Sequence, residues 1–171
     1  MGRWRSRIGL LILALVCLLI AAGCGGRMPK ALAEGSGRLA PCPSSPNCVS
    51  SDATDELHSI AAYRIRGDAD TAWRGLASHL AELPRVEIVR NEDGYLHAVF
   101  TTRLMRYRDD VEFELDEGAG VIRVRSASRV GHGDMGVNRE RIESIRAALA
   151  ERGLVEPLES SQVPSAKVPR E

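Results

Sequence analysis

The sequence from Asp110 to Arg125 reads DVEFELDEGAGVIRVR, and it contains the pattern that most directly predicts the fold. Apolar residues alternate with charged residues on both sides of a glycine-containing turn, which is typical of two strands that each bury one face. If Phe113 lies opposite Val124, then Glu112 lies opposite Arg125. Apolar pairs would then line one face and opposite charges the other. The stretch therefore predicts an antiparallel hairpin.

Three flanking segments extend this hairpin into a domain. A second hairpin is predicted over residues 86–100, with Ile88 opposite Ala98. A strand over residues 58–65 precedes a helix that begins after Asp68 and ends before Pro84. The last helix begins near Asn138, the expected N-cap, and ends at Gly153. The predicted order is β-α-β-β-β-β-α, an α+β fold with two layers, a mainly antiparallel sheet and two helices.

The N-terminus has the features of an export signal. Three arginines precede an apolar run, Ile8–Ala22, whose 15 residues are fewer than the roughly 20 that a membrane-spanning helix needs. The following Cys24 ends the sequence IAAGC, which resembles the bacterial lipobox. That resemblance implies that residues 1–23 are a lipoprotein signal peptide and that lipidated Cys24 becomes the mature N-terminus. An uncleaved anchor and an ordinary secreted protein remain alternatives.

These features predict a domain organisation and a location. We expect a flexible tether at 24–40, one α+β domain at 41–154 and a disordered tail at 155–171, which is rich in proline. The expected location is the cell envelope, with the protein lipid-anchored on the periplasmic face of the outer membrane if the host has two membranes. The mature chain would have 20 basic and 23 acidic residues, which argues against a nucleic-acid partner.

Two cysteines, Cys42 and Cys48, remain in the expected domain. An exported chain matures in an oxidising space, so we expect a disulfide between them. A redox-active pair and a metal site that also uses His58 are alternatives. The spacing is not that of a C-x-x-C motif, and zinc sites usually have four ligands.

Three segments together resemble one family. They are residues 41–51 (PCPSSPNCVSS), residues 109–113 (DDVEF) and residues 125–139, which include RSASRVG and DMGVNR. The chain is similar here to the domain-of-unknown-function family numbered 1499. The resemblance covers residues 40–153 and implies that the cysteine pair, the paired aspartates and the Arg/Ser loop are shared features. It does not supply an activity.

The polar loop from Arg125 to Arg139 is the predicted ligand-binding site. It leads into a helix N-terminus, where free N–H groups favour an anion, and its arginines can bind carboxylate or phosphate. We expect a small anion, a lipid headgroup or a partner protein of the envelope as the ligand. The alternative is structural, because arginine and aspartate commonly satisfy each other in buried loops. The candidate residues are Asp109, Asp110, Arg125, Ser126, Ser128, Arg129, Asp134, Asn138 and Arg139.

An enzymatic function has little support in the sequence. The alternative we keep is an envelope hydrolase that uses Ser126 or Ser128 with His132. However, no G-x-S-x-G elbow, H-E-x-x-H motif or phosphate-binding loop is present. We therefore expect a membrane-anchored envelope lipoprotein without catalytic residues, cofactor or metal.

Overall fold

The computed structural model describes residues 39–92 and 94–157. The proposed signal peptide, Cys24 and residues 158–171 of the predicted tail lie outside these ranges. The described elements are β1 (Cys48–Ser50), β2 (Tyr63–Arg64), α2 (Ala69–Glu82), β3 (Val86–Glu92), β4 (Tyr95–Thr101), β5 (Arg108–Asp116), β6 (Val121–Ser128) and α3 (Val137–Glu151).

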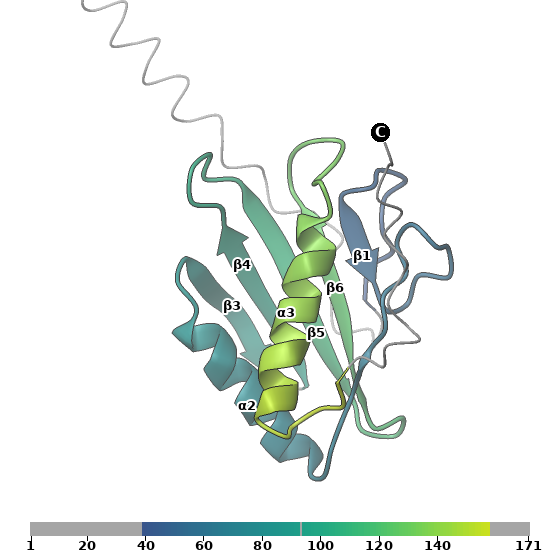
Figure 1. Cartoon of the computed structure of the whole chain (residues 1–171), viewed down its shortest axis with the longest axis vertical. Helices are drawn as coiled ribbons and strands as arrows, with labels where there is room; N and C mark the ends of the chain where they lie inside the picture. Colours follow the sequence, from purple (N-terminus) through teal and green to yellow (C-terminus); the bar gives the residue numbers. More distant parts are fainter. Residues whose placement is uncertain (1–38, 93, 158–171) are drawn as a thin grey trace, which may run out of the picture.

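The strands form one antiparallel sheet in the order β1-β6-β5-β4-β3 (Figure 1). Both β1 and β2 pair with the same edge of β6: β1 with residues 125–127 and β2 with residues 121–122. The β5–β6 hairpin has the predicted register, with Phe113 opposite Val124 and Glu112 opposite Arg125. The α+β class predicted from the sequence is therefore confirmed.

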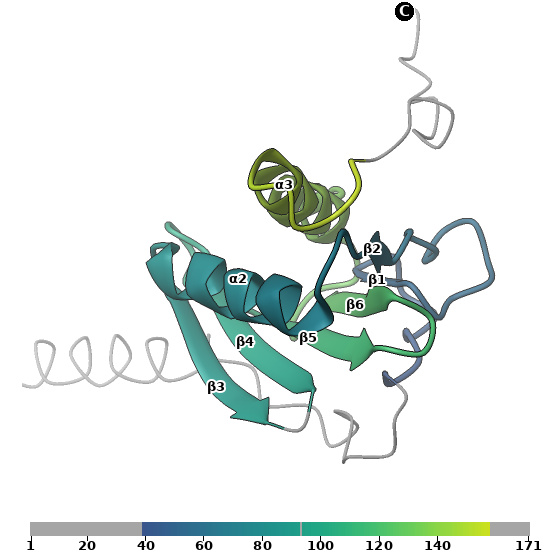
Figure 2. The same cartoon turned by 90° about the horizontal axis from the view of Figure 1, so that it is seen from below.

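Both helices lie on the same face of the sheet (Figure 2). We call this side the helix face and the other side the second face. The helix face carries the core, because alternate apolar strand residues meet the apolar stripes of α2 and α3 there. Fully buried core residues include Tyr63, Leu76, Phe113, Ile142 and Leu149. Asp68 caps α2 as predicted, accepting a hydrogen bond from the backbone N–H of Thr71 (2.7 Å).

The predicted element order omits one strand. β1 precedes the first predicted strand, and of residues 58–65 only Tyr63 and Arg64 form a strand. The observed order is thus β-β-α-β-β-β-β-α. The sequence does not predict β1, because its three residues are all buried and show no alternation of apolar and polar side chains.

The start of α3 also differs from the prediction. Asn138 is not the N-cap: Gly136 occupies that position, in a left-handed conformation (φ 83°), and makes no side-chain cap. Asp134 accepts hydrogen bonds instead from the N–H groups of Gly136 (3.0 Å) and Asn138 (2.8 Å). Asn138 therefore lies inside the first turn, where it is fully buried.

The folded region extends beyond the predicted boundary at residue 154. Val155 is fully buried and forms a β-bridge with Ile65, and the N–H of Glu156 donates to the carbonyl of Arg64. At the other end, Leu39 is buried although the predicted tether included it. Within residues 39–92 and 94–157, no helix is both long enough and apolar enough to cross a membrane.

Candidate functional site

The disulfide between Cys42 and Cys48 is present, with 5.7 Å between the two Cα atoms. It closes a loop in which Asn47, only 4% exposed, connects to the 125–139 loop. The Asn47 side-chain amide donates to the carbonyl of Gly131 (2.7 Å), and its backbone carbonyl accepts from the N–H of Ser128 (3.0 Å). The disulfide loop is thus bonded through Asn47 to the 125–139 loop.

His58 packs against this disulfide loop rather than binding a metal with the two cysteines. Its Nε2 lies 3.2 Å from the carbonyl oxygen of Ser45, and its Nδ1 lies 2.7 Å from a carboxylate oxygen of Asp55. Because both cysteine sulfurs are used in the disulfide, neither is a thiolate available to a metal. Among the described residues no cluster of three or more His, Cys, Asp or Glu has metal-binding geometry.

Asn138 organises a polar network on the helix face. Its amide nitrogen donates to the carbonyl of Asn47 (2.9 Å), to Ser128 Oγ (3.0 Å) and to Asp134 Oδ2 (2.7 Å). Its amide oxygen accepts from the hydroxyl of Ser126 (2.6 Å). A buried amide with every hydrogen-bonding group used fixes the loop between β6 and α3.

Arg141 extends this network to the first of the paired aspartates. One guanidinium nitrogen donates to Ser126 Oγ (2.9 Å) and to Asn138 Oδ1 (2.6 Å), and the other forms an ion pair with Asp109. The guanidinium also lies over the ring of Phe100, 5.0 Å from the ring centre. Arg141 is absent from the sequence-predicted set. Its place three residues after Asn138, on the same helix face, is the signal that could have identified it.

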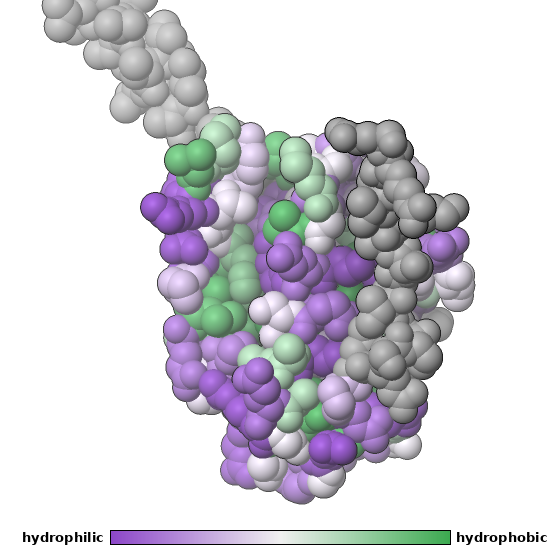
Figure 3. All heavy atoms as spheres, viewed as in Figure 1, coloured by the Kyte–Doolittle hydropathy of each residue, from purple (hydrophilic) through white to green (hydrophobic). Residues whose placement is uncertain are grey.

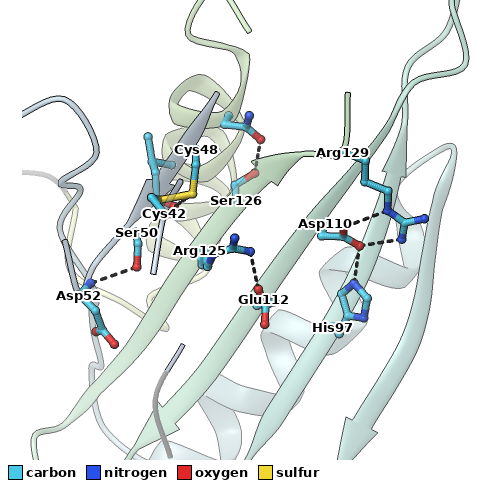
Figure 4. A network of polar contacts seen from close by, with 12 residues as sticks. Cys42, Cys48, Ser50, Asp52, His97, Asp110, Glu112, Arg125, Ser126 and Arg129 are labelled. Atoms are coloured by element: carbon cyan, nitrogen blue, oxygen red, sulfur yellow. Dashed lines mark hydrogen bonds and ion pairs between the residues drawn. A yellow bond between two sulfur atoms is a disulfide. The ribbon is translucent and has the colours of Figure 1, made fainter. Parts of the chain in front are cut away.

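The second aspartate belongs to a separate network on the second face (Figure 4). Asp110 is fully buried and accepts from Arg129 Nε (2.9 Å) and Nη2 (2.7 Å), while His97 Nε2 lies 2.8 Å from Oδ1. Burial acts to raise the pKa of Asp110. The hydrogen bonds from His97 and Arg129 outweigh burial and lower that pKa below its usual value. Conversely, the hydrogen bond with Asp110 raises the pKa of Arg129.

A second buried ion pair, Arg125–Glu112, lies beside the Asp110 network on the second face. Arg125 donates to Glu112 Oε2 (2.7 Å), and the hydroxyl of Tyr95 donates to Glu112 Oε1 (2.7 Å). Burial, followed by the charge of Glu112, raises the pKa of Tyr95 far above its usual value. Figure 4 shows Arg125 pointing along the sheet toward Glu112 and Arg129 pointing toward Asp110. The register predicted the Arg125–Glu112 pair, but not its burial.

The candidate residues therefore divide between two faces instead of converging on one pocket. Ser126, Ser128, Asp109 and Asn138 belong to the helix-face network, whereas Asp110, Arg125 and Arg129 belong to the second face. Arg139 points elsewhere, with its guanidinium donating to the carbonyl of Leu57 (3.2 Å). Arg125 and Arg129 already have carboxylate partners, so neither presents an unpaired charge to an anion.

The hydrolase alternative requires a serine oxygen next to a histidine nitrogen. Ser126 is fully buried, and its hydroxyl donates to Asn138. Ser128 Oγ accepts from the same amide, and His132 lies exposed on the loop. Among the hydrogen bonds of the described residues, none joins either serine to His132. The hydrogen bonds of the two serines hold the loop between β6 and α3.

A cavity of about 470 Å³ lies at the opposite end of β6 from this loop, near the β5–β6 turn. Arg123 lies 3.7 Å from Glu114 and 3.3 Å from Asp116 across its lining. Burial raises the pKa of Glu114. The lining residues are Asp70, Trp73, Gly94, Glu114, Leu115, Asp116, Glu117 and Arg123.

The three segments that suggested a family are thus close together in the fold. Residues 41–51 contact the 125–139 loop through Asn47, and the paired aspartates contact it through Arg129 and the adjoining helix. The family described as "Protein of unknown function (DUF1499)" matches residues 38–149. The chain belongs to this family. Neither a curated protein nor a solved structure matches the chain.

The DUF1499 match covers every residue of the candidate site and names no ligand. The three segments that resemble the family contain the Cys42–Cys48 disulfide, the paired aspartates and the arginine that binds Asp110. Both buried arginines of the second face are paired with carboxylates, although Nε of Arg125 is buried without a hydrogen-bond partner among the described residues. The solvent-exposed part of the 125–139 loop includes Val130, His132, Met135 and Val137.

Proposed function

We propose that this protein is a lipoprotein of the bacterial cell envelope, held at a membrane by lipid on Cys24. Its folded domain would act as a binding module through the exposed part of the 125–139 loop, and not as an enzyme. The location would be the periplasmic face of the outer membrane in a host with two membranes. We do not propose a hydrolase, because no hydrogen bond within residues 39–92 and 94–157 joins Ser126 or Ser128 to His132.

The observation that carries the proposal is the disulfide between Cys42 and Cys48. Disulfides form and persist in oxidising compartments outside the cytosol, which is where a cleaved export signal would deliver the chain. Cys48 is 1% exposed and sits in β1, so the disulfide is part of the folded domain. It agrees with the short apolar leader that ends at Cys24.

The binding role is supported by the way the loop is constructed. Its buried residues are held at several points, which gives the exposed residues Val130, Met135 and Val137 a fixed base. Rigid support of an exposed loop is the usual arrangement of a binding surface. Arg139 follows this loop in the first turn of α3, and its single described hydrogen bond is to the neutral carbonyl group of Leu57.

Mass spectrometry of the protein extracted from its native membrane tests the anchor. We expect a mature chain that begins at Cys24, carries covalent acyl chains and contains an intact Cys42–Cys48 disulfide. The Cys24→Ser variant should incorporate no lipid. The Cys17→Ser variant is the matched control, because Cys17 lies within the leader and should be removed with it.

Two results would contradict the proposal. One is a mature N-terminus at a residue other than Cys24, and the other is equal lipid incorporation in the parent chain and the Cys24→Ser variant. A domain isolated with both thiols of the 42–48 pair free would also remove the argument for an oxidising compartment.

A further inference from the structure

One end of the domain exposes large apolar side chains on two neighbouring loops. We define the loop end as residues 102–108, which join β4 to the first residue of β5, together with residues 130–137, between β6 and α3. On the first loop the exposed side chains are Leu104 (87%), Met105 (53%) and Tyr107 (38%). On the second they are Val130 (44%), Met135 (104%) and Val137 (41%).

These two loops lie at the same end of the domain and are joined at their bases. The N–H of Arg129, where the second loop begins, donates to the carbonyl of Arg108, where the first loop ends (3.1 Å). Figure 1 shows both loops projecting past the same end of the sheet. In the matching space-filling view, hydrophobic side chains gather along this upper edge of the molecule (Figure 3).

The charge of the loop end is positive. Residues 101–108 read TTRLMRYR and contain three arginines but no acidic residue. Within the described ranges, Arg103, Arg106 and Arg108 take part in no ion pair. Asp134 is the acidic residue of the second loop, and its carboxylate is turned inward onto the N–H groups at the start of α3.

Backbone conformation at both tips holds exposed side chains at an energetic cost. Arg106 has φ of 56° and Met135 has φ of 54°. Side chains other than glycine, asparagine or aspartate rarely adopt this left-handed region. Backbone strain of this kind concentrates at functional sites, where the side chain itself is needed. An arginine and a fully exposed methionine are thus kept where glycine would be easier to accommodate.

We propose that the loop end binds the surface of an anionic lipid bilayer. Leu104, Met105 and Met135 enter the boundary between headgroups and acyl chains, while the three arginines contact lipid phosphates. Apolar side chains that alternate with unpaired positive charges are the pattern by which proteins bind membrane interfaces. Charge complementarity selects anionic lipid as the occupant. This inference rests on the proposed membrane location, and it adds the contact between the domain and that membrane.

The anchor leaves the loop end within reach of the bilayer. Leu39 is fifteen residues after Cys24, and an extended chain of that length spans about 50 Å. A tether of this length also gives the domain a high effective concentration at the membrane. Weak binding by the loop end would therefore be enough to orient the domain against the surface.

Vesicle flotation tests the proposal without the lipid anchor. The chain from Gly25 to Glu171 contains every described element, and it can be exported behind a cleavable secretory signal so that the disulfide forms. We expect it to bind vesicles of phosphatidylglycerol, to bind vesicles of phosphatidylcholine far more weakly, and to dissociate as salt is raised. Inorganic phosphate at equal ionic strength should compete no better than chloride.

Two sets of variants separate the contributions. Replacing the three arginines (Arg103→Gln, Arg106→Asn and Arg108→Gln) should lower partitioning into phosphatidylglycerol vesicles roughly 100-fold. An apolar set (Leu104→Ser, Met105→Ser and Met135→Asn) should lower it at least 10-fold. Asparagine is chosen at the two left-handed positions because it tolerates that conformation.

Matched controls lie away from the loop end. Arg66→Gln removes an exposed arginine from the end of the molecule near the β5–β6 turn, and Val89→Ser removes an exposed valine from β3. Neither should change vesicle binding, and no variant should lower the thermal midpoint below that of the parent. Retained vesicle binding in either loop-end set, or an equal loss in the controls, would overturn the proposal. A chain that binds no vesicles at all would also overturn it.

The same design separates this inference from the proposed function. If mass spectrometry finds no lipid on Cys24 but flotation depends on the loop end, the anchor fails and the surface contact stands. If lipid is present but flotation does not depend on the loop end, the anchor stands and the surface contact fails.

Discussion

Replacing Asp110 with asparagine would remove one carboxylate on which two buried side chains depend. Asp110 is 0% exposed, and the side chain of Arg129 is 3% exposed. Asparagine preserves the shape of the site but leaves the Arg129 guanidinium without a counter-charge. Breaking a buried pair in this way costs about 3–5 kcal/mol of unfolding free energy. An exposed pair such as Asp70–Arg74, in which both side chains are at least 69% exposed, is worth about 0.5 kcal/mol or less.

The ionisation of Asp110 should also make the unfolding free energy depend on pH. Because the pKa of Asp110 is lower in the folded chain than its usual value of 3.8, its ionised form stabilises the native state. That contribution is fully present above the usual pKa and disappears as the pH falls through the folded pKa. Acidification below about pH 4 should therefore destabilise the parent, while Asp110→Asn should lack this part of the pH dependence.

Urea unfolding followed by circular dichroism measures both effects. The parent, Asp110→Asn and the control Asp70→Asn should be compared at neutral pH and through the acid range, with the disulfide intact. A cost below about 1 kcal/mol for Asp110→Asn would refute the reasoning, because it is the value expected of an exposed pair. An unchanged acid limb in that variant would refute the assignment of the pH dependence to Asp110.

Three further predictions concern the elements that support the site. Replacing Cys42 and Cys48 with serine should lower the unfolding free energy by about 2 kcal/mol, the chain-entropy value for so short a loop, as measured by urea unfolding. Asn138→Ala should cost roughly 3 kcal/mol in the same assay, because it leaves several buried polar groups without partners. Asp68→Ala should remove the cap of α2 and lower stability by about 1 kcal/mol, which thermal unfolding would detect as a reduced midpoint.

The sequence predicted those parts of the fold in which the alternation of apolar and charged residues matches the buried and charged faces of the strands. The β5–β6 hairpin was predicted with its register, because alternating side chains leave no second way to bury one face. In the β3–β4 hairpin the pairing of Ile88 with Ala98 is also as predicted. A bulge after Ile88 then shifts the register, so that Glu92 pairs with Tyr95. A bulge places two residues of one strand opposite a single residue of its partner. The alternation of apolar and polar residues in this sequence gave no sign of that extra residue.

The candidate site was predicted in composition but not in arrangement. The structural alternative, in which arginine and aspartate satisfy each other, describes Asp110 and Arg129. The sequence did not indicate that the charged second face is buried, because charged alternate residues usually mark a solvated face. The predicted cap at Asn138 was wrong for a related reason. Asparagine is a common N-cap, but here tertiary contacts with Asn47 and Ser126 place it inside the helix.

Variants at buried residues of the 125–139 loop should differ from variants at its exposed residues in their effect on stability. Arg125, Arg129 and Asn138 satisfy carboxylates and backbone groups, so their replacement should act first on stability. Met135 is fully exposed and makes no such contact, so its replacement should leave stability nearly unchanged. A loss of function at Met135 without loss of fold would therefore locate the binding surface. The same loss at Arg129 would report only that the loop had lost its support.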